Sequence, residues 1–439
     1  MLTIFLRTSL ILTSLTCLAV GELMPLYPGS PLTGFKAAPG APWPMPQSWQ
    51  NSTNQMTLDP LTFQITSNVP GCDVIASAIQ RYSVYLNLDR DGVTDPDLSE
   101  ITTLSVTIEN QTCGENYFPY YNMDESYSLT ISDTSEATLN SPTIWGALRA
   151  RLRGIRVIPE FDSPGHCWSW GQGYPELLTP CWGEGLDGGP YKPNYPYHSA
   201  SELMNPIEDF TYEFVGNLLE EAAGYFPDQY LHLGMDGVSY NCWNSNPNIT
   251  QWMEDVGYTD ITQVAQYYCN RIIENVSSIG AKLILYQDPL DNGVNIGSET
   301  IVEVWNGPWE DNMLSVTNLG YDAILSAPWY LNYISYGEDW DDYYIVEPYS
   351  FTNNPTLQGH VKGGEACMWG EFIDGTNIFS TTWPRASTVA ERLWSAQSIN
   401  NPDDAKYRLD QQRCRMDRRR IPAQTLTASY CGDYEWTFN

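Results

Sequence analysis

The sequence predicts an α/β fold of the (β/α)8 barrel type, preceded by a smaller α+β domain. Two observations carry this prediction. From residue 155 onward, short apolar runs alternate with segments of helical periodicity, which is typical of a parallel sheet covered by helices. Polar and charged residues follow several of these runs, at the strand ends where barrel proteins place their chemistry.

Residues 22–140 predict the smaller domain. After an extended entry rich in Pro and Gly, Leu58–Thr66 is a strand candidate, and Cys72–Leu88 has the apolar spacing of a helix. Ile101–Glu109 and Ser126–Ser132 alternate between apolar and polar residues, as strands do. One helix with a few strands makes an α+β domain.

Residues 141–439 predict the barrel. The strand candidates are Ile155–Phe161, Tyr230–Met235, Lys282–Gln287, Ile301–Trp305, Asp322–Ala327 and Gly363–Trp369. The expected helices are Asp209–Ala223, Ile261–Ile279 and Asp403–Arg418. These are six strands, and closure needs eight. A βαβ unit takes about 30 residues or more, and none fits before the first candidate. Either the barrel is incomplete, or a divergent barrel closes around strands that the pattern does not reveal.

Composition limits the partners of this chain. Its 439 residues carry a formal net charge of −32 and a pI near 4.2, which argues against nucleic acid and anionic membrane surfaces. Such an excess of carboxylates suits a compartment of low pH, where partial protonation reduces their repulsion. The aromatic content of 13% suits stacking on sugars, although aromatic residues are also core filler.

The N-terminus predicts export. Met1–Gly21 reads as a signal peptide, with Arg7, an apolar run and a small-residue cleavage site. The alternative is a membrane anchor, but the run is shorter than the ~20 residues that a span needs. We therefore expect the secretory pathway, with the lysosome or the extracellular space as destination. Four glycosylation sequons agree with export, at Asn51, Asn110, Asn248 and Asn275.

The cysteines indicate an oxidising compartment. Nearest-neighbour pairing suggests the disulfides Cys72–Cys113, Cys181–Cys242 and Cys414–Cys431. Three cysteines would remain free and buried, namely Cys167, Cys269 and Cys367. With no CxxC motif, no clustered His and Cys, and only four His in all, the spacing predicts no metal site and no cofactor.

The stretch Tyr230–Trp243 is the most informative part of the chain. A short apolar run ends in Gly234, and a second glycine, Gly237, follows Asp236. A carboxylate at the carboxyl end of a barrel strand is placed for catalysis. The alternative is an Asp that caps the next helix.

The surrounding motifs decide between these interpretations. YLHLGMDGVSYNCW, together with RGIRVIPEFDSPGH, LLTPCW, LSAPWYLN, GGEACMWGE, WPRA and AERLW, resembles the family-20 glycoside hydrolases, the β-N-acetylhexosaminidases. The resemblance covers nearly the whole chain after the first twenty residues and is closest to the lysosomal type. It implies the same three disulfides, N-acetylhexosamine-terminated glycans as partners, and a homo- or heterodimer.

The resemblance also implies a mechanism. In this family the 2-acetamido oxygen of the substrate attacks the anomeric carbon, so the enzyme needs a general acid and a carboxylate that orients the acetamido group. Asp236 matches the orienting carboxylate. Gly237 stands where the family has its acidic Glu, so the acid is absent. Four other carboxylates near strand ends are conceivable replacements, Asp288, Glu303, Glu365 and Glu371, although each would approach from another direction.

Further residues match the family's sugar pocket. They are His166, Tyr286, which replaces a Trp, Trp305, Tyr330, Asn332, Trp369 and Glu371. Tyr333 occupies a place that can carry Arg in the lysosomal α type, so recognition of anionic sugars is not expected. For each aromatic residue the alternative role is core packing.

The resemblance finally locates the missing strands. WGALR precedes the first barrel strand in the family, whereas ARLRGIRV introduces the third, so two βα units are absent at the Ala150–Arg151 junction. In the family these units carry an arginine that binds sugar hydroxyls and an aspartate near the pocket. Two functions stay open: an active β-N-acetylhexosaminidase, or an impaired relative that binds glycans or serves as a partner subunit.

Overall fold

The computed structural model describes residues 42–88, 97–114, 118–120, 122–132, 134–149, 156–181, 203–335, 338–426 and 431. The expected signal peptide and the Ala150–Arg151 junction lie outside these residues. The chain divides into two compact units. One unit comprises Met1–Pro46, Ile334–Ile345 and Asp374–Asn439, and the other comprises Gln47–Tyr333 and Val346–Ile373.

The first sheet of the larger unit has four strands in the order β2-β4-β6-β5. Their bounds are Gln64–Ser67, Thr103–Asn110, Glu136–Thr143 and Ser128–Ile131. The first three run parallel, and β5 is antiparallel to β6. A separate parallel pair is formed by β1 (Met56–Thr57) and β3 (Ser99–Glu100).

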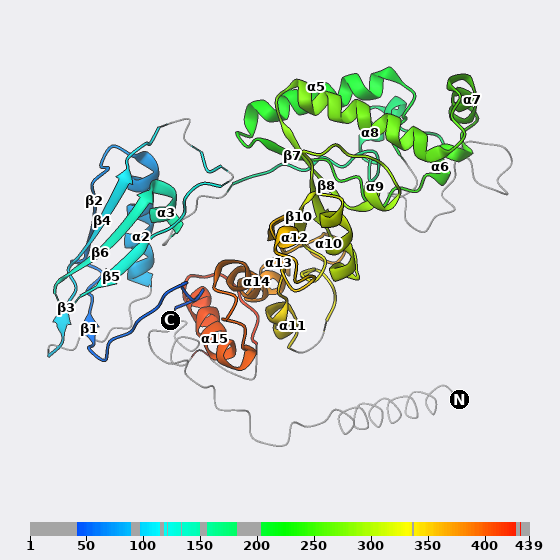
Figure 1. Ribbon diagram of the computed structural model, residues 1–439. Coiled ribbons are helices and arrows are strands. Elements are labelled where there is room, and N and C mark those ends of the chain that lie inside the picture. The colour runs from blue at the N-terminus through cyan, green and yellow to red at the C-terminus, as the bar shows by residue number, and fades with distance from the viewer. Residues whose placement is uncertain are drawn as a thin grey trace, which may run out of the picture. The chain divides into compact units, whose positions relative to one another are not determined.

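Two helices accompany this sheet, α2 (Asp73–Leu88) and α3 (Ile144–Arg149) (Figure 1). Ile75 of α2 and Trp145 of α3 are buried in one apolar cluster with Leu104 and Leu139 of the strands. The prediction of a small α+β domain is thereby confirmed, although the first strand candidate begins later than expected, at Gln64.

The sequence did not reveal β6, which is the central strand beside β4. Its buried positions alternate as expected, but two of the four are Ser141 and Thr143. Their hydroxyl groups donate to the backbone carbonyls of Ser126 at 3.0 Å and Asp124 at 2.6 Å. Because these hydrogen bonds satisfy buried hydroxyls, polar residues occupy core positions, and the apolar alternation is lost.

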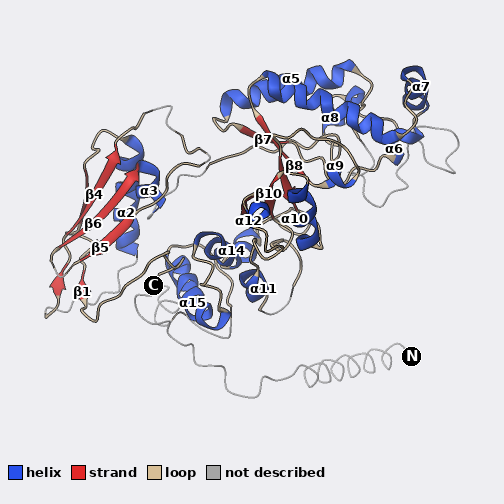
Figure 2. Ribbon diagram, viewed as in Figure 1, coloured by secondary structure: helices blue, strands red, loops and turns tan. Residues whose placement is uncertain are grey.

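The second sheet contains five parallel strands in the order β11-β10-β9-β8-β7. Three of them, β7, β8 and β10, are labelled in Figure 2. Their bounds are Val361–Gly364, Asp322–Leu325, Ile301–Val304, Lys282–Tyr286 and Tyr230–His232. Each predicted strand is present in sequence order but shorter, and β11 begins two residues before the predicted Gly363.

The remaining predicted strand, Ile155–Phe161, contributes residues that pair with β7 at the edge of this sheet. Glu160 forms a parallel bridge with His232, and the Phe161 amide donates to the His232 carbonyl at 2.9 Å. Among the described residues, β11 pairs in the sheet only with β10, and the Glu160 segment pairs only with β7. The described sheet therefore has two outer borders.

Helices connect these strands. Two long ones, α5 (Asp209–Tyr225) and α8 (Ile261–Ser278), pack against each other. Asp260 caps α8 and forms a capping box with Gln263. The other elements of this region are α4 (Trp170–Gly173), η1 (Pro175–Leu177), α6 (Asn241–Ser245), α7 (Pro247–Val256), α9 (Asp288–Asp291), α10 (Trp309–Asn318) and α12 (Pro355–Gln358).

The regular elements among the described residues of the smaller unit are helices. Its helices are α11 (Trp340–Ile345), α13 (Ile378–Thr382), α14 (Arg385–Trp394) and α15 (Pro402–Arg418). Glu391 of α14 is completely buried and accepts hydrogen bonds from Arg408 Nη1 at 2.5 Å, the Tyr344 hydroxyl at 2.8 Å and the Met45 amide at 2.7 Å. Trp43 lies under the Arg408 guanidinium, 5.0 Å from it.

All three predicted disulfides are present, and Cys167, Cys269 and Cys367 are free and buried as expected. Asn51, Asn110 and Asn248 are exposed. Asn275 is half-buried, and its amide nitrogen donates to the Tyr212 carbonyl at 2.8 Å. No helix in the described part of the chain is long and apolar enough to cross a membrane.

Candidate active site

The turn after β7 carries the central carboxylate. Gly234 and Met235 both have a positive φ, of 66° and 70°. A side chain at position 234 would place its Cβ 2.6 Å from an Asp162 oxygen, so only glycine fits. Beyond this turn, Asp236 Oδ2 lies 3.2 Å from His166 Nε2, and this hydrogen bond raises the pKa of His166. Two residues that the motifs singled out separately therefore lie within hydrogen-bonding distance of each other.

Position 237 bears no side chain and has little room for one. Gly237 has a φ of 61°, and a Cβ built there would lie 2.9 Å from His166 Nε2. Its amide donates to Asp288 Oδ1 at 3.1 Å. The Trp305 indole donates to the other oxygen of Asp288 at 2.6 Å. Asp288 therefore ties this turn to the neighbouring aromatic residue.

The predicted aromatic residues form a continuous row. The Tyr286 and Trp305 rings are 6.2 Å apart, the Trp305 and Tyr330 rings 6.4 Å, and the Tyr330 and Tyr333 rings 5.1 Å. Trp369 hydrogen-bonds to Tyr330. Tyr286 and Tyr330 are buried, whereas Trp305 and Trp369 keep partial solvent contact.

Two further predicted residues, Asn332 and Glu371, approach each other beyond the isolated bridge between Tyr330 and Cys367. Asn332 is buried, and its amide nitrogen is 3.5 Å from Glu371 Oε2, whereas Glu371 itself is exposed. Glu371 therefore contacts Asn332 and is not placed by any described contact at the 237 turn.

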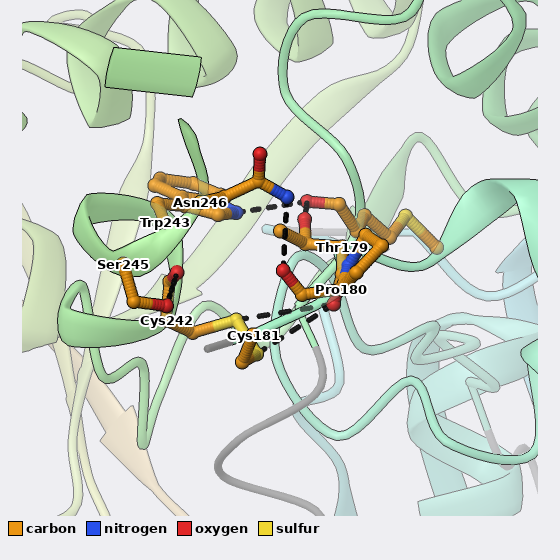
Figure 3. Close-up of a disulfide and its surroundings, with 8 residues drawn as sticks. Thr179, Pro180, Cys181, Cys242, Trp243, Ser245 and Asn246 are labelled. Atoms are coloured by element: carbon orange, nitrogen blue, oxygen red, sulfur yellow. Dashed lines mark hydrogen bonds between the residues drawn. A yellow bond between two sulfur atoms is a disulfide. The ribbon is translucent and has the colours of Figure 1, made fainter. Parts of the chain in front are cut away.

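A disulfide fastens the loop that follows the turn. Cys242 in α6 is bonded to Cys181, and Figure 3 shows this bond beside Asn246 and Pro180. The Asn246 amide donates to the Pro180 carbonyl at 2.9 Å (Figure 3). The loop leaving Gly237 is thus held both covalently and by a hydrogen bond.

The structure brings together an interior cluster that the sequence analysis missed. His232 in β7 lies between two carboxylates, with Nδ1 3.3 Å from Glu160 and Nε2 3.5 Å from Glu303. Ligand atoms of Glu303, Glu365 and Cys367 lie within 4.8 Å of one another, a grouping that could hold a metal ion. Because Glu160, His232 and Glu303 are far apart in sequence from one another and from Glu365 and Cys367, local spacing gave no sign of the cluster.

The surroundings raise the pKa of two groups in this cluster, Glu365 and His232, and of the nearby Asp162. Burial, with the charge of Glu303, raises the pKa of Glu365 to about 8. Burial, with Glu160 and Asp236, raises the pKa of Asp162 to about 6. Burial lowers the pKa of His232, but the two flanking carboxylates outweigh this effect and raise it to about 10. Much of Glu365 is exposed to solvent, but a carboxylate oxygen of this residue lies close to the buried Glu303 and Cys367.

We expect the free energy of unfolding to fall as the pH rises from 5 to 9. Glu365 and His232 have higher pKa values folded than their ordinary 4.5 and 6.5, so the folded chain binds more protons. Their stabilising contribution is complete below the ordinary values and is lost as the pH rises through the raised ones. Thermal melting across this range measures the trend, and Glu365→Gln should flatten it. A melting temperature that rises with pH would contradict it.

Comparison with known proteins identifies the family of the chain. Residues 148–397 match glycosyl hydrolase family 20, catalytic domain, and residues 42–151 match a β-acetyl hexosaminidase-like domain. Because the catalytic match alone spans more than half of the sequence, the chain belongs to glycosyl hydrolase family 20, a family of glycosidases.

Its curated relatives narrow this class. The chain is 45% identical to the β-hexosaminidase subunit beta of Felis catus over 289 residues, covering 65% of this chain and 52% of that protein. It is also 45% identical over 286 residues to the subunit alpha of Mus musculus, covering 64% and 52%. The chain thus spans about half the length of these relatives. The subunit alpha of Bos taurus aligns over 521 positions at 32% identity, covering 90% of this chain and 96% of that protein.

Solved structures share the fold. An inactive mutant of a family-20 exo β-N-acetylglucosaminidase from Vibrio harveyi superposes with a TM-score of 0.70 at 16% identity, covering 91% of this chain and 80% of that one. A chitobiase from Flavobacterium johnsoniae gives 0.69 at 20% identity, covering 86% and 73%. At such identities the likeness concerns the fold alone.

Proposed function

We propose that this chain binds terminal, non-reducing N-acetylhexosamine on glycoconjugates and hydrolyses it only weakly. The observation that carries the proposal is the turn at Gly237. Asp236, which matches the orienting carboxylate of the family, hydrogen-bonds to His166, but position 237 has no proton donor. A positioned general acid typically contributes about 10²- to 10⁴-fold to the rate, so its loss affects hydrolysis more than binding.

The four conceivable replacement carboxylates are engaged elsewhere. Asp288 is the one next to Gly237, but each of its oxygens already accepts a hydrogen bond. Glu303 and Glu365 belong to the interior cluster around His232. Glu371 contacts Asn332. These contacts favour the interpretation that none of the four carboxylates replaces the missing general acid.

We infer from the motifs that two βα units are absent at the Ala150–Arg151 junction, and their absence would support the same proposal. The bovine alignment spans 521 positions but covers 90% of the 439 residues of this chain, so a substantial part of the aligned length has no residue here. The two outer borders of the described sheet agree with strands missing between β11 and the Glu160 segment. An arginine and an aspartate of the family pocket would be lost with them.

Full activity as a retaining, substrate-assisted β-N-acetylhexosaminidase is the second candidate. It is favoured by the intact Asp236–His166 pair and by the row from Tyr286 to Tyr330. Either function fits a glycoprotein of the secretory pathway, lysosomal or extracellular, since the three disulfides suit an oxidising compartment. We further propose that the chain pairs with itself or with a related subunit.

Binding and turnover of the purified secreted protein test the proposal. N-acetylglucosamine-thiazoline, which mimics the cyclised intermediate, should bind in calorimetry, and Asp236→Ala should abolish this binding. Hydrolysis of a chromogenic N-acetylglucosaminide should be about 10²- to 10⁴-fold below that of the Felis catus subunit beta. Turnover within tenfold of that relative would establish the second candidate instead, and absence of thiazoline binding would refute both.

A further inference from the structure

Asp288 receives hydrogen bonds from two separate parts of the pocket. It begins α9, directly after β8 and Gln287. One oxygen accepts from the Gly237 amide at 3.1 Å, and the other accepts from the Trp305 indole at 2.6 Å. The donors follow strands β7 and β9, on either side of the strand that carries Asp288. One carboxylate thus spans three adjacent strand ends.

The bond to Trp305 fixes the orientation of a pocket wall. A hydrogen bond to an ionised acceptor is stronger than one between neutral groups, and 2.6 Å is short for an N–H donor. The Trp305 ring lies between Tyr286 and Tyr330 and is only partly buried. Packing alone leaves such a ring free to rock about its axis, whereas a fixed indole nitrogen removes that freedom.

The bond to Gly237 fixes the turn. Glycine loses more backbone freedom on ordering than any other residue, and this one is held at a φ of 61°. An acceptor for its amide favours that single conformation over the alternatives. The backbone of Asp236 is also held in place, because Asp236 and Gly237 share a peptide unit.

We propose that Asp288 is the positioning residue of this pocket, holding the Asp236–Gly237 turn and the Trp305 ring in one arrangement ready for the sugar. The inference rests on the proposed function for the identity of its ligand. Asp288 acts through Asp236 and Trp305 and need not touch the sugar. Neither contact is visible in the motifs, because the sequence separations are 51 and 17 residues.

Asp288→Asn isolates this role. An amide has the shape of the carboxylate but only one acceptor oxygen, so it satisfies either Gly237 or Trp305 and leaves the other donor unpaired. We expect N-acetylglucosamine-thiazoline to bind about 10- to 100-fold more weakly, as befits a lost hydrogen bond to a charged group. Asp291→Asn is the matched control on the same helix, because the described hydrogen bond of the Asp291 carboxylate goes to Gln287, and its loss should leave binding unchanged.

A double-mutant cycle tests whether Asp288 acts through Trp305. Trp305→Phe keeps an aromatic ring and removes the indole donor. If the two residues form one unit, Asp288→Asn should weaken thiazoline binding much less in the Trp305→Phe background than in the wild type. Equal and additive effects would show that Asp288 acts independently of this ring and would overturn that part of the proposal.

A ligand-free measurement separates the inference from the proposed function. The fluorescence difference between the wild type and Trp305→Phe reports this tryptophan alone. Asp288→Asn should increase acrylamide quenching of that difference at an unchanged melting temperature, whether or not any sugar binds. Unchanged quenching would overturn the positioning role, whereas changed quenching without thiazoline binding would overturn only the proposed function.

Discussion

Gly237→Glu should leave chromogenic N-acetylglucosaminide hydrolysis at the wild-type level, although it places an acidic residue at the family's acid position. Residue 237 has a φ of 61°, and a left-handed conformation costs a residue with a side chain roughly 1–2 kcal/mol. The new Cβ would also lie 2.9 Å from His166 Nε2. Relief of that contact displaces the imidazole that holds Asp236, so the variant gains an acid and disturbs the orienting carboxylate.

Steady-state kinetics with Gly237→Ala as the control separates these effects. Alanine introduces the same Cβ without an acid, so it should lower thiazoline affinity and the melting temperature by amounts similar to those of glutamate. Recovery of hydrolysis by about 100-fold or more in Gly237→Glu, the lower end of what a general acid contributes, would mean that the turn adapts and that the rest of the pocket is competent. It would then be position 237 alone that distinguishes this chain from an active enzyme.

Arg408→Met should destabilise the smaller unit by about 3–5 kcal/mol, because it leaves a buried charge without its partner. Glu391 is fully buried, and Arg408 is its cationic partner in the ion pairs of the described residues. Tyr344 and the Met45 amide also donate to Glu391 but carry no charge. Denaturant unfolding of the whole protein measures the loss as a shifted transition of this unit.

Lys406→Met is the matched control on the same helix. Lys406 pairs with Glu338 at 3.0 Å, but both side chains are about one-third exposed. Such a surface pair contributes about 0–1 kcal/mol, so its removal should shift the transition little. Similar losses for the two variants would mean that burial does not amplify the Arg408–Glu391 interaction, which would contradict the prediction.

The elements that the sequence predicted best are those with a local signal. Cys72–Leu88 was predicted from its apolar spacing, and the structure has α2 over Asp73–Leu88. The parallel strands were predicted from their apolar runs, in the observed order. The β11 strand was misplaced because its pairing ends at Gly364, after a register shift in β10, while the apolar pattern continues into the loop beyond.

The site was predicted in part for the same reason. Motifs located Asp236, His166 and the aromatic row, since each stands in a recognisable stretch. They did not locate the contacts between strands. Glu303 faces His232 only because β9 pairs with β8 and β8 with β7 in a particular register, and Asp288 reaches Gly237 across the same arrangement. A register set by pairing between segments far apart in the chain leaves no periodicity that one sequence can reveal.

The two borders of the described parallel sheet have a consequence for the protein in solution. Among the described residues, no strand pairs with β11 on the side away from β10 or with the Glu160 segment on the side away from β7. An unpaired strand edge is a template on which any extended peptide adds itself by main-chain bonds. If two copies of the chain paired through these outer strands, each would provide hydrogen-bond partners for the backbone of the other. The fraction of monomer would then depend on protein concentration more than on temperature.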